Sequence, residues 1–382
     1  MKFLFLANTR PNPDEGASGC DLATIRALRE LGHEVDDIWL GEHRRRIRHN
    51  NLHQLCELPF LFRDAMLERF RNGIYDVVQI SQPHGYLAAK THRALKLPGV
   101  FIIRSHGWEP RAWAEVKRHG FDRRPAWRRA ATVGLRMFLA RHNQRSLRYA
   151  DGIVVCSRDD AASLSRDVEP EQLLALSPGV PSYFLSVPPE FAPERFRRVL
   201  FAGSYSAHKA PEVVAGVMRA LAASDRMTDL TWVTQDSAHD DVRRLLGPAA
   251  ERVRLRGWMP RQELLELYDS HGFFLQPSHY EGYCMAFLEA MARGCCVLAT
   301  NISGPGEKIV HGRNGFLFDR GDAEGIARTI LDLTEHPDLC GSISREARRT
   351  AAVMTWEATA RRFSRFCEGL LERKMAGIIC RP

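Results

Sequence analysis

The sequence predicts an α/β protein built from two units of similar size, each formed around a parallel sheet. Short apolar runs of strand length recur along the 382 residues and alternate with segments of helical periodicity, which is typical of parallel sheets with crossover helices. Three prolines fall within residues 187–193, as in a linker, and the same alternation then begins again. We therefore expect one domain over residues 1–184 and a second over 185–382, facing a ligand-binding cleft at the carboxyl ends of the strands.

The first domain is predicted to open with a strand at residues 2–7, followed by a loop of small residues at 16–19. One face of the next helix carries an apolar residue at every third position, namely Leu22, Ile25, Leu28 and Leu31. Gly32 is suited to end that helix. Further strands are predicted at four apolar runs, at residues 35–40, 77–80, 100–103 and 153–156.

The second domain is predicted to contain five strands, at residues 199–202, 230–233, 253–255, 273–276 and 296–299. A last amphipathic helix is predicted over about residues 355–372. Hydrophobic residues make up 45% and charged residues 26% of the chain, as in ordinary globular proteins. No uncharged apolar stretch approaches the roughly 18 to 20 residues that a membrane-spanning helix requires. We therefore expect a cytoplasmic protein.

Cysteines and charge restrict the possible partners further. The nine cysteines form no Cys-x-x-Cys pair, so neither a disulfide framework nor a zinc site is expected. The net charge is +8, yet residues 101–150 alone hold 12 Lys and Arg against 3 Asp and Glu. A local basic patch predicts a local anionic partner, not nucleic acid bound over the whole surface.

Residues 111–148 contain an apolar stripe between basic side chains. At helical spacing the stripe comprises Trp127, Ala131, Leu135 and Phe138. The basic side chains around it include Lys117, Arg118, Arg123, Arg124, Arg128, Arg129, Arg136 and Arg141. This pattern suits peripheral binding to the anionic inner face of a membrane. The alternative is a helix whose stripe packs on its own domain and whose arginines are solvated.

The most informative segment is residues 274–294, which reads as strand, polar loop, helix and terminal glycine. Glu281 falls in the loop and Glu289 in the helix. Backbone N–H groups around residues 283–286 would begin this helix, and such a terminus favours a phosphate. Eight residues of helix rise by about 12 Å, whereas glycosidase carboxylates sit roughly 5 to 9.5 Å apart. The two acids are therefore expected at opposite ends of an extended ligand.

These residues also carry a family resemblance. Glu281 and Glu289 form Glu-x7-Glu, and Glu-Gly-Tyr-Cys-Met-Ala-Phe-Leu-Glu-Ala-Met-Ala-Arg-Gly closely resembles the signature of the family-four retaining glycosyltransferases. Other segments resemble the same family in the same order, namely Arg104-Ser105-His106-Gly107, Leu200-Phe201-Ala202-Gly203, Gly304-Pro305-Gly306-Glu307 and Thr355-Trp356-Glu357. The resemblance implies the GT-B fold, with two Rossmann-like domains and a last helix that crosses back to the first domain.

The resemblance also implies roles for individual residues. Glu281, His106 and Lys209 would be catalytic, with Lys209 on the diphosphate and His106 reaching the sugar. Donor-binding positions would be Gly19, Gly203, Ser204, Gly282, Tyr283, Cys284, Met285 and Glu289. The family commonly has arginine where this chain has Ser204, so another cation, such as His208 or Arg256, would have to compensate. Trp258 would either shape the pocket for the base or pack in the core.

The implied reaction is sugar transfer, with retention of configuration, from a nucleotide-diphosphate sugar, most readily a UDP-sugar. The acceptor would be the hydroxyl of a glycan, a lipid-linked sugar or a small molecule. No Asp-x-Asp triplet occurs; such a triplet would hold a metal on the diphosphate, so we expect neither a metal nor another cofactor. The alternative is a non-catalytic nucleotide-sugar-binding protein that kept the fold, which the uncharged Ser204 would favour. An epimerase on the same fold usually lacks Glu-x7-Glu.

Overall fold

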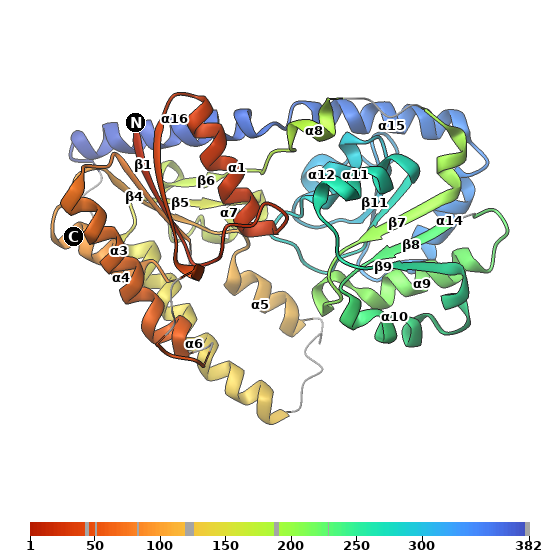
Figure 1. The fold of residues 1–382 in the computed structure, drawn as a ribbon, viewed down its shortest axis with the longest axis horizontal. Helices are drawn as coiled ribbons and strands as arrows, with labels where there is room; N and C mark the ends of the chain where they lie inside the picture. The colour runs from red at the N-terminus through yellow and green to blue at the C-terminus, as the bar shows by residue number, and fades with distance from the viewer. Residues whose placement is uncertain are drawn as a thin grey trace. The chain divides into compact units, whose positions relative to one another are not determined.

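The computed structural model describes residues 1–42, 46–49, 52–81, 84–118, 126–186, 191–227 and 229–378, without the side chains of residues 42, 116, 117 and 126–136. The chain forms two compact units (Figure 1). The first comprises Met1–Ala114, Asp122–Pro178 and Trp356–Pro382, and the second comprises Glu115–Phe121 and Gly179–Thr355. The last helix therefore belongs to the first unit. The boundary after Pro178 places residues 179–184 in the second unit.

The first unit contains a six-stranded parallel sheet with the order β2-β1-β3-β4-β5-β6. Its strands are β1 (Lys2–Ala7), β2 (Glu34–Trp39), β3 (Val77–Ser81), β4 (Val100–Arg104), β5 (Gly152–Val155) and β6 (Leu173–Ala175). The helices up to Pro178 are α1 (Gly16–Glu30), α3 (Leu58–Asn72), α4 (Tyr86–Ala94), α5 (Glu109–Arg118), α6 (Ala126–Tyr149) and α7 (Arg158–Leu164). The five strands expected from the sequence are present; β6 was not predicted.

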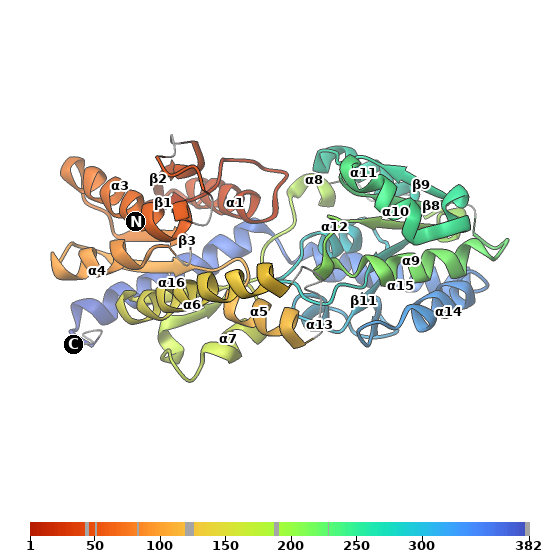
Figure 2. The same ribbon diagram turned by 90° about the horizontal axis from the view of Figure 1, so that it is seen from below.

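Alternation along β1 supplies both faces of this sheet with apolar side chains. Phe3 and Phe5 join a buried cluster with helix α1 and with α16 (Trp356–Met375), while Leu4 and Leu6 join a second cluster with α3 and α4. Helix α16 lies beside α1 (Figures 1 and 2). Its Phe363 ring lies 6.0 Å from that of Phe3. The amphipathic pattern predicted near the carboxyl terminus thus forms part of the first unit's core.

Residues 16–19 do not form the predicted loop. Helix α1 begins at Gly16, and the Gly19 amide donates to the Glu15 carbonyl (3.0 Å). Ser18 and Gly19 are both buried, so the small side chains serve close packing in the first turns of α1. The N–H of Gly19 is thus engaged within α1, and donor binding at Gly19 stays a prediction.

The second unit contains a parallel sheet with the order β12-β11-β10-β7-β8-β9. Its strands are β7 (Arg198–Ala202), β8 (Asp229–Val233), β9 (Val253–Arg256), β10 (Phe273–Gln276), β11 (Cys296–Thr300) and β12 (Phe316–Phe318). Its helices are α8 (Ser182–Leu185), α9 (Pro211–Ala222), α10 (His239–Leu246), α11 (Arg261–Ser270), α12 (Ala286–Ala292), α13 (Pro305–Lys308), α14 (Ala323–Leu333) and α15 (Pro337–Ala352). All five predicted strands form, and only the edge strand β12 was missed.

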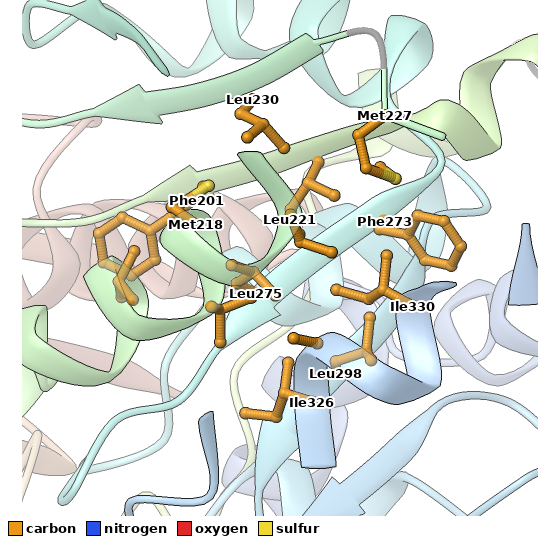
Figure 3. Packing of buried hydrophobic residues seen from close by; sticks show 14 of the residues in the cluster. Phe201, Met218, Leu221, Met227, Leu230, Phe273, Leu275, Leu298, Ile326 and Ile330 are labelled. Atoms are coloured by element: carbon orange, nitrogen blue, oxygen red, sulfur yellow. The ribbon is translucent and has the colours of Figure 1, made fainter. Parts of the chain in front are cut away.

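One face of this second sheet carries a large apolar core. Side chains of β7, β10 and β11 pack there against α9 and α14 (Figure 3). The residues labelled in that view are Phe201, Met218, Leu221, Met227, Leu230, Phe273, Leu275, Leu298, Ile326 and Ile330. Full burial of each such side chain contributes about 1.5–3 kcal/mol. This core holds β7 and β10 side by side, and with them the two loops that follow those strands.

The predicted basic stretch lies mostly outside the described side chains. The side chains of Lys117, Trp127, Ala131, Leu135, Arg128, Arg129 and Arg136 are not described, nor are residues 119–125. Within the described part, Phe138 is 53% exposed, and the Arg141 guanidinium lies 5.7 Å from its ring centroid. Membrane binding through residues 111–148 stays a prediction. No helix among the described residues is long and apolar enough to cross a bilayer.

Candidate functional site

The second unit brings Lys209 and Glu281 into direct contact. Lys209 lies in the loop after β7 and Glu281 in the loop after β10; because neighbouring parallel strands run the same way, both loops lie at one edge of the sheet. The Lys209 Nζ donates to Glu281 Oε1 at 2.7 Å. The same oxygen accepts from Ser278 Oγ (2.7 Å) and Gln276 Nε2 (2.9 Å). One carboxylate oxygen thus gathers three donors.

The pair is shielded from solvent, which makes its electrostatics strong. The Lys209 side chain is 16% exposed and that of Glu281 9%. Burial opposes the charge on Lys209, but the Glu281 carboxylate and its hydrogen bond outweigh that cost and raise the pKa of Lys209. Lys209 is therefore cationic at any physiological pH. An ammonium has three N–H donors, so the group can hold an anion while it contacts Glu281.

Two left-handed residues shape the backbone around this pair. Cys284 has φ 66° and Ala210, directly after Lys209, has φ 53°. A non-glycine residue in this region costs on the order of 1–2 kcal/mol, and such strain clusters at functional sites. Gly304 closes the same region from another loop: at φ 87°, any Cβ there would collide with the Tyr283 carbonyl.

The Cys284 thiol occupies the start of α12. The backbone N–H groups of Ala286 and Phe287 favour the ionised thiol and so act to lower the pKa of Cys284. Burial, partly offset by Lys209, raises the pKa of Cys284 to about 12, so the group is a neutral thiol at pH 7. That the backbone N–H groups at this helix start face a phosphate stays a prediction. Gly282 is partly exposed in the same loop, whereas Tyr283 and Met285 are buried.

Glu289 lies in the first turn of α12 and is 3% exposed. The Tyr268 hydroxyl donates to its Oε2 (3.3 Å), and Arg261 Nε lies 3.4 Å from its Oε1. Both partners come from α11. Only residues from Ala286 onward are helical, so the 12 Å separation that assumed eight helical residues between Glu281 and Glu289 does not apply. The partners named here for Glu289 differ from those of Glu281.

In the loop after β7, neither Ser204 nor His208 supplies a second positive charge for the diphosphate. Ser204 Oγ lies 3.0 Å from Ser206 Oγ, and the Gly203 amide donates to the Val233 carbonyl (3.1 Å). Burial lowers the pKa of His208, with the nearby Lys209 charge acting in the same direction against Glu281. His208 is therefore neutral at pH 7 and does not replace the missing arginine.

Two further candidates for contacts with the donor, Arg256 and Trp258, lie at the end of β9 and in the loop that follows it. Arg256 ends the strand with an exposed side chain. Trp258 is 57% exposed. This exposure excludes the core-packing role for Trp258 and leaves its ring open to a ligand.

In the first unit, His106 lines a cavity of about 250 Å³. The cavity is bounded by residues at the carboxyl ends of β1, β3 and β4, and its walls are Asn8, Thr9, Ala17, Asp21, Ser81, Arg104, Ser105, His106, Gly107 and Glu109. His106 Nε2 lies 3.1 Å from Asp21 Oδ1, and Arg104 Nη1 lies 3.4 Å from the same oxygen. Arg104 is 2% exposed and also donates to Thr24 Oγ1 (3.0 Å).

The two cations keep Asp21 ionised, and Asp21 in turn keeps His106 charged. Burial opposes ionisation of Asp21, but His106 and Arg104 outweigh it and lower the pKa of that carboxyl. Burial likewise opposes protonation of His106, yet Asp21 outweighs it and raises the pKa of His106 well above 6.5. The cavity therefore presents an imidazolium at neutral pH, which can donate but not accept hydrogen bonds.

The sequence did not single out the partners of the predicted residues. These partners are Asp21 and Arg104 in the first unit, and Arg261, Tyr268, Gln276 and Ser278 in the second. Gln276 and Ser278 had a readable signal, because both follow directly on the apolar strand β10. Tyr268 and Asp21 had none, since each lies on a helix and meets its partner only through the tertiary fold.

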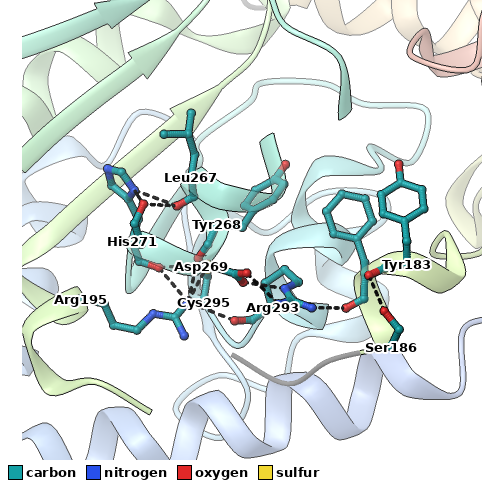
Figure 4. Close-up of polar contacts among 11 residues, drawn as sticks. Tyr183, Ser186, Arg195, Leu267, Tyr268, Asp269, His271, Arg293 and Cys295 are labelled. Carbon is teal, nitrogen blue, oxygen red and sulfur yellow. Dashed lines mark hydrogen bonds and ion pairs between the residues drawn. The ribbon is translucent and has the colours of Figure 1, made fainter. Parts of the chain in front are cut away.

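Two buried arginines, Arg195 and Arg293, form hydrogen bonds at the carboxyl ends of α11 and α12 (Figure 4). Arg195 Nη2 donates to the carbonyls of Tyr268, His271 and Arg293 at 2.7–3.0 Å. Arg293, which directly follows α12, forms a two-pronged ion pair with Asp269 (2.6 and 2.7 Å). It also donates to the Phe184 carbonyl at 3.0 Å, which ties α8 to this unit. Helices α11 and α12 are thus joined by charged hydrogen bonds in addition to apolar contacts.

The chain is similar in sequence to known sugar-transferring proteins. Residues 196–336 match the family model described as Glycosyl transferases group 1. The D-inositol 3-phosphate glycosyltransferase of Thermobispora bispora is 30% identical over 223 residues, 53% of this chain and 52% of that protein. Sucrose synthase 5 of Arabidopsis thaliana is 38% identical over 104 residues, 25% of this chain and 12% of that protein. The match to the first of these relatives thus spans about half its length.

Solved structures share the whole architecture. Sucrose-phosphate synthase from Thermosynechococcus elongatus has a TM-score of 0.74 at 17% identity, covering 99% of this chain and 100% of that one. Anabaena HepE in complex with UDP-glucose has a TM-score of 0.70 at 16% identity, covering 96% and 99%. Such low identity establishes the fold alone. The resemblance predicted from the sequence is confirmed: residues 196–336 match the group 1 glycosyl transferase family model, and the fold of the chain is GT-B.

Proposed function

We propose that this protein transfers a sugar from a nucleotide-diphosphate donor, with a UDP-sugar favoured, to an acceptor hydroxyl with retention of configuration. The observation that carries the proposal is the shielded Lys209–Glu281 pair, 2.7 Å apart at the carboxyl edge of the second sheet. Complexes of the structural neighbour HepE with UDP and UDP-glucose support the choice of donor.

The proposed chemistry follows from the charges. Lys209 stabilises the diphosphate as its negative charge grows in the transition state. The bond from the anomeric carbon to the phosphate oxygen breaks, and the acceptor oxygen forms its bond on the same face. The departing phosphate oxygen takes the acceptor's proton. Glu281 contacts the donor sugar near the anomeric carbon, and Glu289 accepts from the ribose. We propose that no metal takes part, since Lys209 supplies the compensating charge.

The first unit's cavity would receive the acceptor side of the reaction. His106 is held cationic by Asp21, so it can donate to a sugar hydroxyl. The acceptor would be a glycan, a lipid-linked sugar or a small molecule, as the sequence predicted.

Donor hydrolysis is the first test, because it needs no acceptor. Purified protein should release UDP from one nucleotide sugar in a panel, and NMR of the product formed with a simple acceptor should show the donor's anomeric configuration. Activity should persist in EDTA. An inverted product would contradict the retaining proposal, and loss in EDTA with recovery in manganese would contradict metal independence.

A non-catalytic nucleotide-sugar-binding protein is the second candidate. It is favoured by one observation, namely that neither Ser204 nor the neutral His208 provides a second cation for the diphosphate. Tight binding of a UDP-sugar without UDP release, with or without acceptors, would select this candidate over the enzyme.

A further inference from the structure

The second unit contains a cavity of about 320 Å³ to which neither the family resemblance nor the proposed function gives a role. Its walls come from α8, α12 and α15, and they are Leu185, Ala292, Arg345, Arg348, Arg349 and Ala352. The cavity lies at the carboxyl end of α12. Lys209 and Glu281, in contrast, lie in the loops that follow β7 and β10. The cavity is therefore a separate place on the same unit, with three arginines and an apolar floor.

Two of the three cations of this cavity lack a carboxylate partner among the described residues. Within the described ranges of the chain, neither Arg345 nor Arg348 forms an ion pair with a carboxylate. Arg348 Nη1 is buried without a hydrogen-bond partner among those residues. Arg349 is already paired with Glu346, which also binds Arg313. A buried donor left without an acceptor destabilises the fold, so these groups favour an added anion.

Two further arginines near the cavity, Arg293 and Arg195, add positive charge and so also favour binding of an anion. Burial lowers the pKa of Arg348, and the charges of Arg293 and Arg195 lower it further against a smaller opposing effect of Asp269. Arg293 and Arg195 cannot turn toward the cavity to be neutralised there, because their hydrogen bonds to Asp269 and to backbone carbonyls hold them in place (Figure 4). The cavity thus keeps positive charge on Arg345 and Arg348 that no carboxylate among the described residues pairs with.

We propose that this cavity is a binding site for a phosphate monoester, with Arg345 and Arg348 as the groups that hold the phosphate. A monoester carries about −1.5 to −2 charges and three acceptor oxygens, so it can serve both guanidinium forks, whereas a carboxylate balances only one. Planar guanidinium groups match phosphate oxygens in pairs. The side chains of Leu185, Ala292 and Ala352 provide an apolar floor for the body that carries the phosphate. That body is a small phosphorylated molecule or the headgroup of a phosphomonoester lipid.

The test uses inorganic phosphate and the full chain in a Lys209→Gln background, which removes the cation of the proposed donor site. Phosphate titrated at constant ionic strength should saturably raise the melting temperature, because it binds the folded state alone. The double substitution Arg345→Gln/Arg348→Gln should weaken this binding at least tenfold. The matched control is Arg243→Gln/Arg244→Gln, which removes the same charge from the exposed side of α10 and should stay within twofold.

The outcomes separate cleanly. Phosphate that gives no saturable stabilisation, or that binds the Arg345/Arg348 double variant as tightly as the control, overturns the proposal. Should the double variant fail to fold, the single substitution Arg345→Gln, at an exposed position, gives the same comparison with an expected loss of at least threefold. Glycerol 3-phosphate and vesicles of phosphatidylcholine with phosphatidic acid then identify the source. Tighter binding of the soluble ester indicates a metabolite, and preferential vesicle binding that the double substitution abolishes indicates a lipid headgroup.

Discussion

A single oxygen of Glu281 accepts hydrogen bonds from Lys209, Gln276 and Ser278. This concentration of donors fixes the carboxylate in place before any ligand arrives, which is the condition for strong stabilisation of a transition state. The three donors are expected to stabilise the Glu281 carboxylate to different extents, because among them only Lys209 carries a charge.

Replacing Glu281 by alanine is expected to lower kcat by at least 100-fold while donor binding stays measurable. The reason is that a preorganised contact at the reacting centre is worth about 3 kcal/mol or more. Ser278→Ala is the matched control, since it removes one neutral donor to the same oxygen and should cost about 1 kcal/mol. Steady-state kinetics and calorimetry with the donor make the comparison. A near-normal kcat in Glu281→Ala would rule out the assigned role.

Glu289→Gln is expected to weaken UDP binding by roughly 1.5–3 kcal/mol, because the ribose would lose a charged acceptor. The control is Tyr268→Phe, which removes only the 3.3 Å hydrogen bond to Glu289 and leaves the carboxylate. Calorimetry with UDP and with GDP checks both variants. Unchanged affinity for both nucleotides would place Glu289 outside the binding site.

Asp21→Asn is expected to lower the pKa of His106 below 6.5, because burial would then act without the carboxylate that opposes it. NMR titration of the histidine Cε1 protons measures this, with His106→Gln to assign the signal and Asp37→Asn, at a partly exposed carboxylate, as the control. The two shifted pKa values also determine how each residue's contribution to folding stability changes with pH. His106 has a raised pKa, so its contribution is full below pH 6.5 and is lost as the pH rises through the folded value. Asp21 has a lowered pKa, so its contribution is lost as the pH falls below 3.8 toward the folded value. A His106 pKa that does not move in Asp21→Asn would contradict this account.

At the scale of elements, helix α16 is positioned by one glycine of the sheet. A Cβ at Gly152, the first residue of β5, would lie 2.5 Å from Leu370 Cδ1 and 3.2 Å from the Phe366 ring. Both partners lie on α16. Since Leu370 is 1% exposed in the core, the helix has little room to move aside.

Gly152→Ala is therefore expected to destabilise the first unit by about 1–3 kcal/mol through overpacking. Gly369→Ala supplies a control of opposite sign on the same helix. A Cβ there meets no atom within 4 Å, and alanine is preferred to glycine inside a helix by about 1 kcal/mol. Urea unfolding measures both changes. Equal effects of the two substitutions would show that α16 is not held closely against β5.

The sequence predicted long elements better than short ones, for a physical reason. Ten strands with four or more residues were recognised from their apolar runs, whereas β6 and β12, each three residues at a sheet edge, have too few buried positions to form a pattern. The error at residues 16–19 arose because small residues favour loops locally, while packing in the first turns of α1 also requires them. Propensity alone does not separate these two demands.

The same distinction holds for the candidate site. The family resemblance pointed to Lys209, Glu281 and Glu289 through short motifs, which can be read from neighbouring residues alone. Their partners depend on which helices meet, as with Tyr268 on α11 and Glu289 on α12. Similarly, the charged state of His106 depends on Asp21, which lies 85 residues away. No local pattern reports such a contact.

At the scale of the whole molecule, the two units differ in how they are assembled from the chain. Apart from residues 115–121, the second is continuous, Gly179–Thr355, and contains its own apolar core. The first requires α16, whose Ala360, Phe363, Cys367 and Leu370 are buried in the cluster with β1 and α1. Each of the larger apolar side chains contributes about 1.5–3 kcal/mol on burial, a large share of a domain's net stability.

Residues 179–355 expressed alone are accordingly expected to fold and to bind UDP, whereas residues 1–178 alone should not give a cooperative unfolding transition. Circular dichroism with thermal melting tests both fragments, and adding a peptide of residues 356–378 to residues 1–178 should restore a transition. A cooperative melt of residues 1–178 without that peptide would show that α16 is dispensable to the first unit.

The position of α16 after residues 179–355 also sets an order for folding on the ribosome. The strands of the first unit emerge first, but the helix that covers one face of their sheet follows only after residues 179–355 have been synthesised. At about 5–20 residues per second, that interval lasts roughly 10 to 40 seconds. Throughout it, the side chains of Phe3 and Phe5 lack their α16 partners and remain available to chaperones. The second unit, although later in the sequence, would be the first to reach its native state.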